Sequence, residues 1–235
     1  MSHMLGRTIL VVAAHPDDEA LGCGATLAQA ARAGAAVHLA FLADGVGARE
    51  PGRLPGEQET LRRDAARQAA NVVGAGSVTH FEFPDNRLDT VALLEVVKAV
   101  ETLIERHKPD TVLTHHAGDL NVDHRIAYQA VITACRPQPG RCVDRVLCFE
   151  VPSSTEWQPP GTAGVFAPQL FVDVSAELRV KRQALEAYVE EMRPWPHARS
   201  YEAVEHLARW RGASVGCEAA EAFVVARWIA RNGQS

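Results

Sequence analysis

Residues 8–24 read TILVVAAHPDDEALGCG. The apolar run at 8–14 ends at a His-Pro turn, a pattern typical of a buried strand in a parallel sheet. An Ala- and Leu-rich segment at 20–33 follows, and Gly34 can adopt the left-handed conformation that ends a helix. A second apolar run lies at 37–43. The chain is therefore expected to open with a strand, helix, strand unit.

The same alternation continues through the rest of the chain. It predicts an α/β fold, Rossmann-like and doubly wound, with a mainly parallel sheet and helices on both faces. Because ligands of such sheets bind at the carboxyl ends of strands, reactive residues are expected directly after strands. Gly- and Pro-rich loops are expected at 44–56 and 153–168. The further elements that we expect are helices at 57–73, 90–107, 122–135, 176–191 and 201–211, and strands at 78–83, 111–114, 145–151, 170–174 and 223–227.

Length and charge limit the class of protein. The chain has 235 residues, 47% of them hydrophobic, and can bury one sizeable core, so we expect a single domain over 5–235. Residues 1–4 look like a cloning scar, which excludes His3 from the chemistry. The net charge of −5 provides no basic field for a polyanion, so nucleic acid is not an expected partner.

Localisation and redox state follow from what the sequence lacks. No apolar run approaches the roughly 18 residues needed to cross a bilayer, and the N-terminus does not have the order of a secretory signal. We therefore expect a cytoplasmic protein with no membrane span.

The five cysteines are scattered without a C-x-x-C pair, which argues against a disulfide framework or a thiolate zinc site. We expect them to be reduced and mostly in the core.

A histidine and three acids follow the first expected strand within five residues. Buried charges are costly without a partner, and a divalent metal is the natural partner for this set. A catalytic zinc usually takes three protein ligands and keeps one position for water. His15 and Asp18 would supply two of them. His124, just beyond the strand expected at 111–114, is the candidate for the third.

Asp17 lies between two of the expected ligands, so its carboxylate can face a metal-bound water instead of the metal. Zinc lowers the pKa of such a water to about 7, and Asp17 would take its proton as general base for attack on an amide. Asp123, beside His124, is expected to orient an imidazole. A capping turn would explain the His-Pro-Asp tripeptide alone, but not its combination with a second acid and an Asp-His pair. The histidines that we expect to be structural or solvent-facing are His38, His80, His107 and His206.

Five segments carry a resemblance to a known family. They are AHPDDEALGCG (14–24), LRRDAARQAANVVG (61–74), FPDNRL (83–88), THHAGDLNVDHR (114–125) and VPSSTEW (151–157). Together they resemble the LmbE-like, or PIG-L, family of zinc-dependent N-acetylglucosaminyl deacetylases. The similarity covers nearly the whole chain, and the first and fourth segments are the most specific.

The resemblance implies the same three zinc ligands and the same general base, Asp17. It adds Arg62 and Asp85 as residues that hold sugar hydroxyls, a role suited to an Arg fork and a carboxylate. The implied activity is removal of an N-acetyl group from an N-acetylglucosamine-type sugar or sugar conjugate. Because members of this family often assemble, a homo-oligomer is also expected.

One position departs from the family pattern. Many members have a histidine three residues before the last zinc ligand, where this chain has Asn121. An amide can donate a hydrogen bond to an oxyanion on the substrate but cannot deliver a proton to the leaving amine. Our first candidate for the proton donor is His197, which lies in a proline-bounded loop; His115, His116 and Asp17 are alternatives.

The loop after the strand at 145–151 is expected to contribute to the substrate cleft. Trp157 offers a flat apolar face for a sugar ring, and Arg199 can line the same cleft. The N-acetylated substrate could be a free N-acetylhexosamine, a nucleotide sugar, a lipid-linked sugar, a glycosylated natural product or a thiol-sugar conjugate. The metal is expected to be Zn²⁺, with Fe²⁺ as an alternative in vivo.

Two other classes of protein compete with this hypothesis. A nucleotide-binding module would share the sheet, but the first strand is followed by acids and lacks the G-x-G-x-x-G order. A non-catalytic zinc-binding regulator would keep the three ligands. The presence of Asp17 beside the ligands favours hydrolysis.

Overall fold

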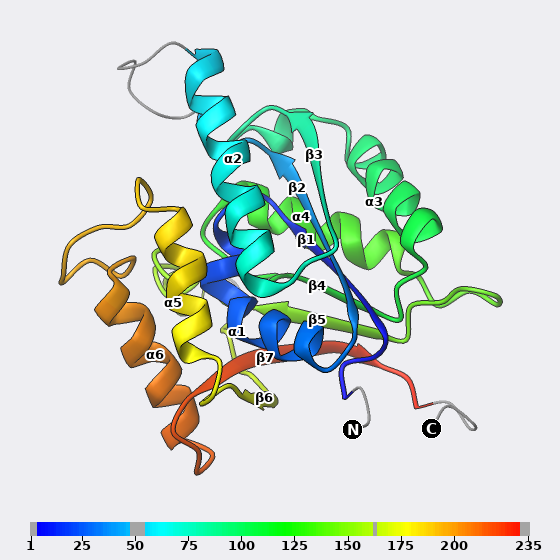
Figure 1. The fold of residues 1–235 in the computed structure, drawn as a ribbon. Coiled ribbons are helices and arrows are strands. Elements are labelled where there is room, and N and C mark those ends of the chain that lie inside the picture. Colours follow the sequence, from blue (N-terminus) through cyan, green and yellow to red (C-terminus); the bar gives the residue numbers. More distant parts are fainter. Residues whose placement is uncertain (1–3, 48–54, 162–163, 231–235) are drawn as a thin grey trace.

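The computed structural model describes residues 4–47, 55–161 and 164–230. Its centre is a seven-stranded sheet with the strand order β3-β2-β1-β4-β5-β7-β6 (Figure 1). The pairs among β1 to β5 are all parallel, whereas β7 runs antiparallel to both β5 and β6. The strands are β1 (Thr8–Ala13), β2 (Ala36–Ala43), β3 (Ser77–Phe83), β4 (Thr111–His115), β5 (Arg145–Phe149), β6 (Leu170–Asp173) and β7 (Ala220–Trp228).

Helices cover both faces of the sheet, as the sequence predicted (Figure 1). Helices α1, α2 and α5 pack together on one face, with α6 beside α5, and α3 packs against α4 on the other. The fold class is therefore confirmed. The helices are α1 (Asp18–Arg32), α2 (Pro55–Val73), α3 (Leu93–His107), α4 (Val122–Ala134), α5 (Leu178–Ala187) and α6 (Tyr201–Ala213), and a 3-10 turn, η1, spans Leu88–Thr90.

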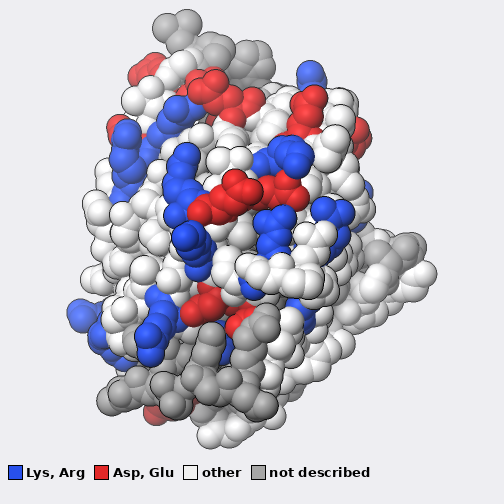
Figure 2. All heavy atoms as spheres, turned by 90° about the vertical axis from the view of Figure 1, so that its right-hand side faces the viewer, with Lys and Arg blue, Asp and Glu red and all other residues white. Residues whose placement is uncertain are grey.

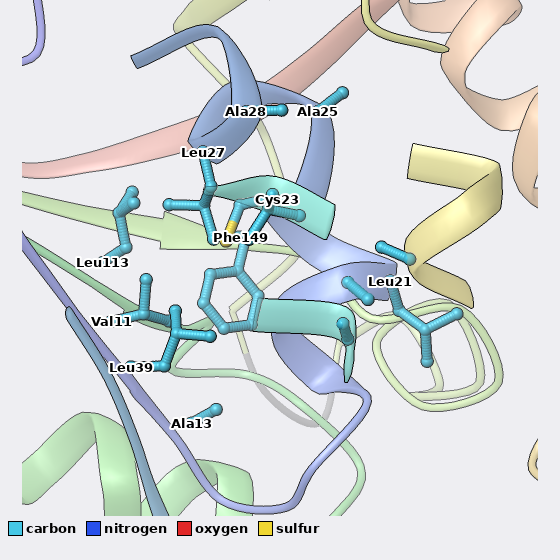
Figure 3. Close-up of a cluster of buried hydrophobic side chains, with 14 of the residues drawn as sticks. Val11, Ala13, Leu21, Cys23, Ala25, Leu27, Ala28, Leu39, Leu113 and Phe149 are labelled. Atoms are coloured by element: carbon cyan, nitrogen blue, oxygen red, sulfur yellow. The ribbon is translucent and has the colours of Figure 1, made fainter. Parts of the chain in front are cut away.

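The alternation along β1 explains the two cores. Ile9 and Val11 belong to the cluster under α1, α2 and α5, whereas Leu10 and Val12 belong to the cluster under α3 and α4. Successive side chains of a strand point to opposite faces, so a strand buried on both sides reads as an uninterrupted apolar run. Figure 3 shows the ring of Phe149 among side chains of β1, β2 and α1. Burying one such ring stabilises the fold by about 1.5–3 kcal/mol.

Several expected boundaries differ from the structure. The helix expected at 90–107 is preceded by the separate turn η1, and the chain is extended at Val91 before α3 begins at Leu93. The helix expected at 176–191 ends at Ala187. Part of the loop expected at 44–56 lies outside the described residues, as do residues 1–3 of the expected cloning scar.

The surface and the cysteines add three observations. On the face that holds α3, basic and acidic side chains are interspersed, without one continuous basic field (Figure 2). Within the described ranges, no helix combines the length and the apolar character that crossing a bilayer requires. All five cysteines are free, and three of them are buried.

The strand order places the two most specific sequence segments next to each other. The chain builds β1, β2 and β3 in one direction along the sheet, and then crosses back to add β4 on the other side of β1. In doubly wound sheets, the crevice at such a reversal is the usual ligand site. The HPDDE segment follows β1 and the GDLNVDH segment follows β4, so both end at this crevice.

Candidate active site

The exit from β1 brings three polar side chains into a buried position. His15, Asp17 and Asp18 are at most 7% exposed. The turn at Pro16 passes directly into α1, and Asp17, the residue before the helix, has φ 116°. A positive φ in a residue with a Cβ costs on the order of 1–3 kcal/mol, and it persists only where the surroundings impose it.

The three predicted metal ligands lie close together beside this turn. The ligand atoms of His15, Asp18 and His124 lie within 4.8 Å of one another, and all three residues are buried. Asp18 Oδ2 lies 3.5 Å from His15 Nδ1 and 3.4 Å from His124 Nε2. His124 reaches the site because α4 begins just after β4, whose neighbour in the sheet is β1.

Two atoms of this group test whether a cation fits. Asp18 Oδ1 and His124 Nε2 are buried and have no hydrogen-bond partner among the described residues. Buried polar atoms without partners are costly, and a divalent cation would satisfy both. One carboxylate and two imidazoles are a ligand set typical of zinc and equally acceptable to iron(II).

A carboxylate orients His124 from its far side. Asp119 is fully buried, and its Oδ1 lies 3.1 Å from His124 Nδ1. Asp119 also accepts hydrogen bonds from the hydroxyls of Ser154 and Thr155, which lie in the loop after β5. Holding Nδ1 in this way leaves Nε2 for a metal, the usual arrangement of a ligating histidine and its carboxylate.

His15 is held by two further carboxylates. Its Nε2 lies 3.0 Å from Asp123 Oδ2 and 3.0 Å from Asp85 Oδ1. Asp123 also accepts the backbone N–H groups of Asn86 and Leu88. His15, Asp85 and Asp123 themselves have spacing compatible with a cation. However, Nε2 must carry the proton if Nδ1 binds the metal, so we interpret these carboxylates as partners that orient His15.

Without a cation, the two histidines of this group are expected to carry positive charge. Burial alone would lower the pKa of His124, but Asp18 and Asp119 raise it to about 9. Burial acts the same way on His15, whose pKa the neighbouring carboxylates nevertheless hold well above its usual value. The protonated rings therefore balance the negative charge of the neighbouring carboxylates. A bound dication would balance the same negative charge.

His115 behaves differently although its ring stacks on His124 at 3.9 Å between centroids. Burial lowers the pKa of His115 to about 3. Its Nε2 accepts the backbone N–H of Ala14 at 2.8 Å, which requires that nitrogen to be unprotonated. His115 is therefore a neutral ring that packs against the site.

The carboxylate of Asp17 is clamped on one oxygen and free on the other. Its Oδ2 accepts from Arg199 Nη1 at 2.7 Å and from Arg62 Nη2 at 3.3 Å. Oδ1 is buried and finds no hydrogen-bond partner in the described part of the chain. Burial raises the pKa of Asp17, while the two guanidinium groups oppose that shift. Oδ1 is thus the atom available to accept a proton.

The expected substrate residues lie around this centre. Arg62 pairs with Glu191 as well as with Asp17, so it faces the base itself. Asp85 contacts His15 and also lines a polar cavity of about 440 Å³ beyond the ends of β2 and β3. Asn121 caps α4, because its Oδ1 accepts the Asp123 N–H, and its Nδ2 donates to Asn86.

His197 and Trp157 lie side by side at the edge of the site. Their ring centroids are 5.7 Å apart, and half of the surface of Trp157 is exposed. His197 Nδ1 accepts the backbone N–H of Arg199, so a neutral ring would carry its proton on Nε2. Arg199 links this loop to the centre, since its Nε also donates to Ser153. His116, the remaining candidate, pairs with the carbonyl of Gly164.

Sequence reasoning did not identify Asp119 or Glu19 as part of the site. Asp119 belongs to the same post-strand segment as His124, and the presence of a second acid besides Asp123 in that segment is a signal that could have marked it. Glu19 was counted only as one of the acids after β1. Its position, with both carboxylate oxygens hydrogen-bonded inside the protein, follows from contacts with α5.

Comparisons with known proteins show the family to which the chain is similar. The family model PIG-L, GlcNAc-PI de-N-acetylase, matches residues 10–135. The chain is 32% identical over 188 residues to the uncharacterized deacetylase YaiS of Escherichia coli strain K12, covering 77% of this chain and 90% of YaiS. It is 28% identical over 190 residues to the diacetylchitobiose deacetylase of Thermococcus kodakarensis, covering 77% of this chain and 69% of that protein.

A solved structure supports the fold. GalB, the 4-carboxy-2-hydroxymuconate hydratase of Pseudomonas putida KT2440, superposes with a TM-score of 0.75 at 24% identity. The match covers 98% of this chain and 100% of GalB. At this identity the likeness shows the shared fold and does not transfer a reaction.

Proposed function

The chain belongs to the PIG-L family, and from that premise we propose that it is a metal-dependent hydrolase that removes an N-acetyl group from an N-acetylglucosamine-type sugar or sugar conjugate. The observation that carries the proposal is the buried group of His15, Asp18 and His124 with the free Oδ1 of Asp17 beside it. The deacetylase relatives support the reaction class. We further propose that the resident metal is Zn²⁺.

When bound, the metal supplies Lewis-acid activation of water and of the amide carbonyl. The remaining steps fall to residues of this chain. Asp17 Oδ1 takes a proton from the attacking water, because Oδ2 is already held by Arg62 and Arg199. Arg199 also places positive charge beside the reacting centre. Asp119 keeps Nε2 of His124 directed at the metal.

The substrate would lie between Arg62, which contacts Asp17, and Asp85, which contacts His15. Arg62 and Asp85 can each engage neighbouring hydroxyls, and Trp157 offers a face for a sugar ring. Asn121 is proposed to line the same cleft. His197 is proposed to protonate the leaving amine, supported by the hydrogen bond that its Nδ1 accepts from Arg199, which leaves Nε2 to carry a proton, and by its place beside Arg199.

The first test is acetate release from a panel of N-acetylglucosamine derivatives by native, chelated and metal-restored protein. We expect activity to disappear on chelation and to return with Zn²⁺, with Fe²⁺ run in parallel. Asp17→Ala should lower kcat about 10²–10⁴-fold, the usual contribution of a general base. His197→Ala should lower kcat by a smaller factor, and Asp89→Ala, a change at an exposed carboxylate, should leave kcat unchanged.

The outcome against the proposal is equally specific. A protein that binds one metal ion per chain and releases no acetate from any member of the panel would favour a non-catalytic metal-binding role. Full activity in Asp17→Ala would remove Asp17 from the reaction.

A further inference from the structure

Two residues that the reaction does not use connect the end of α5 to the proposed base. Glu19 and Tyr188 are each 1% exposed. Glu19 Oε2 accepts the backbone N–H of Asp17 at 3.0 Å, and Glu19 Oε1 accepts the hydroxyl of Tyr188 at 2.7 Å. Both carboxylate oxygens are thus occupied inside the protein, and Glu19 is absent from the groups that could hold a metal among the described residues.

An ordinary helix cap explains only half of this arrangement. A Glu in the first turn of a helix often accepts the N–H of the residue before the helix. Such a carboxylate is normally exposed, because burying it is costly. Here it is buried, and the hydroxyl that accompanies it comes from a residue 169 positions away. The burial of the Glu19 carboxylate in so unfavourable an environment therefore needs a structural explanation.

That reason lies in the backbone of Asp17. Its φ of 116° is unfavourable for a residue with a Cβ. The same N–H group that Glu19 holds fixes this φ, and φ sets where the carboxylate points. A second connection from the segment after α5 reaches the carboxylate itself, through Glu191 and Arg62, whose guanidinium group also lies over the Tyr188 ring.

We propose that Glu19 and Tyr188 are a buried positioning pair that holds the backbone of Asp17 in its strained conformation and so aims Oδ1 at the reacting water. The proposal rests on the proposed function of Asp17. Neither residue touches substrate or metal. Their effect on the reaction therefore passes entirely through the placement of Asp17.

Three variants separate positioning from simple packing. Glu19→Gln keeps the shape, can still accept the Asp17 N–H through its carbonyl, and can donate from its amide to the Tyr188 oxygen. Glu19→Ala removes both hydrogen bonds, and Tyr188→Phe removes only the hydroxyl. Tyr201→Phe, a change at a half-buried tyrosine of α6, is the matched control.

The expected kinetic result is a fall in kcat with little change in KM. Because misplacing a catalytic group by about 1 Å costs about 10²-fold, Glu19→Ala should lower kcat at least about ten-fold. KM should stay within about two-fold, and zinc bound per chain should not change. Glu19→Gln should recover most of the activity, and Tyr188→Phe should lie between. Adding Glu19→Ala to Asp17→Ala should reduce the residual activity no further.

Crystal structures of the same variants give a readout that needs no substrate. We expect the φ of Asp17 to leave the positive region in Glu19→Ala and to stay there in Glu19→Gln. If the wild-type protein proves inactive on every substrate, the proposed function fails, while these structures still decide the positioning. A kcat of Glu19→Ala equal to that of the wild-type protein would overturn the proposal. A loss of activity that matches a loss of zinc bound per chain would also overturn it. If Glu19→Ala does not fold, unchanged kcat and an unchanged Asp17 in Tyr188→Phe would overturn it instead.

Discussion

Asp119 would act on the proposed metal through one imidazole ring. Its carboxylate holds Nδ1 of His124, and no other carboxylate lies on that side of the ring within the described ranges. Asp119→Asn keeps the size but removes the charge, so His124 becomes a poorer and less directed ligand. We expect zinc affinity to fall about 10–100-fold. A competition titration against a chelator of known affinity measures the change.

The control for this change is Asp89→Asn, at an exposed carboxylate in η1. It should leave zinc affinity unaltered. Equal zinc affinity in Asp119→Asn and the native protein would show that the charge of Asp119 is not needed to orient the ring.

At the scale of single residues, the sequence could predict ligand types but not their partners. The candidate metal ligands could be selected because each follows a strand and because a carboxylate and imidazoles buried in that position need a cation, and the structure brings the three side chains together. The partners of His124 and Asp17 are up to 182 positions away. Such pairs depend on how loops from β5 and after α5 pack over the sheet, which no local pattern encodes.

Helix α1 depends on a buried ion pair from two other elements. Lys181 of α5 and Glu221 of β7 are 3% and 4% exposed. Glu221 accepts the backbone N–H groups of Ala25 and Thr26 in the middle of α1, and Lys181 donates to the carbonyl of Leu21. Lys181→Met would leave the Glu221 charge buried without its cation. We expect a loss of about 3–5 kcal/mol in the free energy of unfolding, measured by urea denaturation.

A compensating change and a matched surface change control this experiment. Adding Glu221→Gln to Lys181→Met removes the unpaired charge and should recover part of the stability. Arg182→Met, at the neighbouring exposed position of α5, breaks an exposed pair with Glu186 and the contact of the Arg182 guanidinium with the Tyr201 ring, and should cost at most about 1–2 kcal/mol. A double variant no more stable than Lys181→Met would show that the loss comes from packing.

At the scale of elements, local sequence patterns predicted the positions of strands and helices well where one face of the element is buried along its whole length. They predicted the wrong end residues where tertiary contacts determine the end of the element. The pattern through 176–191 continues past the end of α5, but there Tyr188 and Glu191 face Glu19 and Arg62 instead of continuing the helix. The segment 90–107 includes Val91, which packs against the core beneath α3 and α4 in an extended conformation.

At the scale of the whole molecule, the strand alternation predicted a doubly wound sheet but not its order. The placement of β7 between β5 and β6, antiparallel to both, requires a long connection that the sequence does not specify. The reversal between β1 and β4 brings the two segments with the predicted metal ligands together. The sequence indicated that these two segments should lie close to each other, and the order of the strands explains how they do so.

The buried charges of the site make the stability of the metal-free protein depend on pH. The pKa of His124 is raised to about 9 from 6.5, so its contribution to stability is fully present below pH 6.5 and is lost as the pH rises through about 9. Burial raises the pKa of Glu19 from 4.5 to about 7, so its contribution is present below pH 4.5 and is lost as the pH rises through about 7. The neutral His115, with a pKa of about 3, contributes equally at every pH above 6.5.

The chelated protein should therefore lose stability between pH 6.5 and pH 9, with Tm falling across that range. Zinc should reverse the trend, because a metal must displace the protons on both His15 and His124. Zinc affinity should therefore rise up to about 100-fold per pH unit while both rings are protonated, and more slowly above the pKa of His124 at about 9. Thermal unfolding of chelated and zinc-loaded protein at a series of pH values measures the widening difference between the two Tm values. His124→Asn, which has no proton to lose, should flatten the slope of the chelated protein. A chelated native protein whose Tm is constant or rises from pH 6.5 to pH 9 would contradict the charge state assigned to the metal-free site.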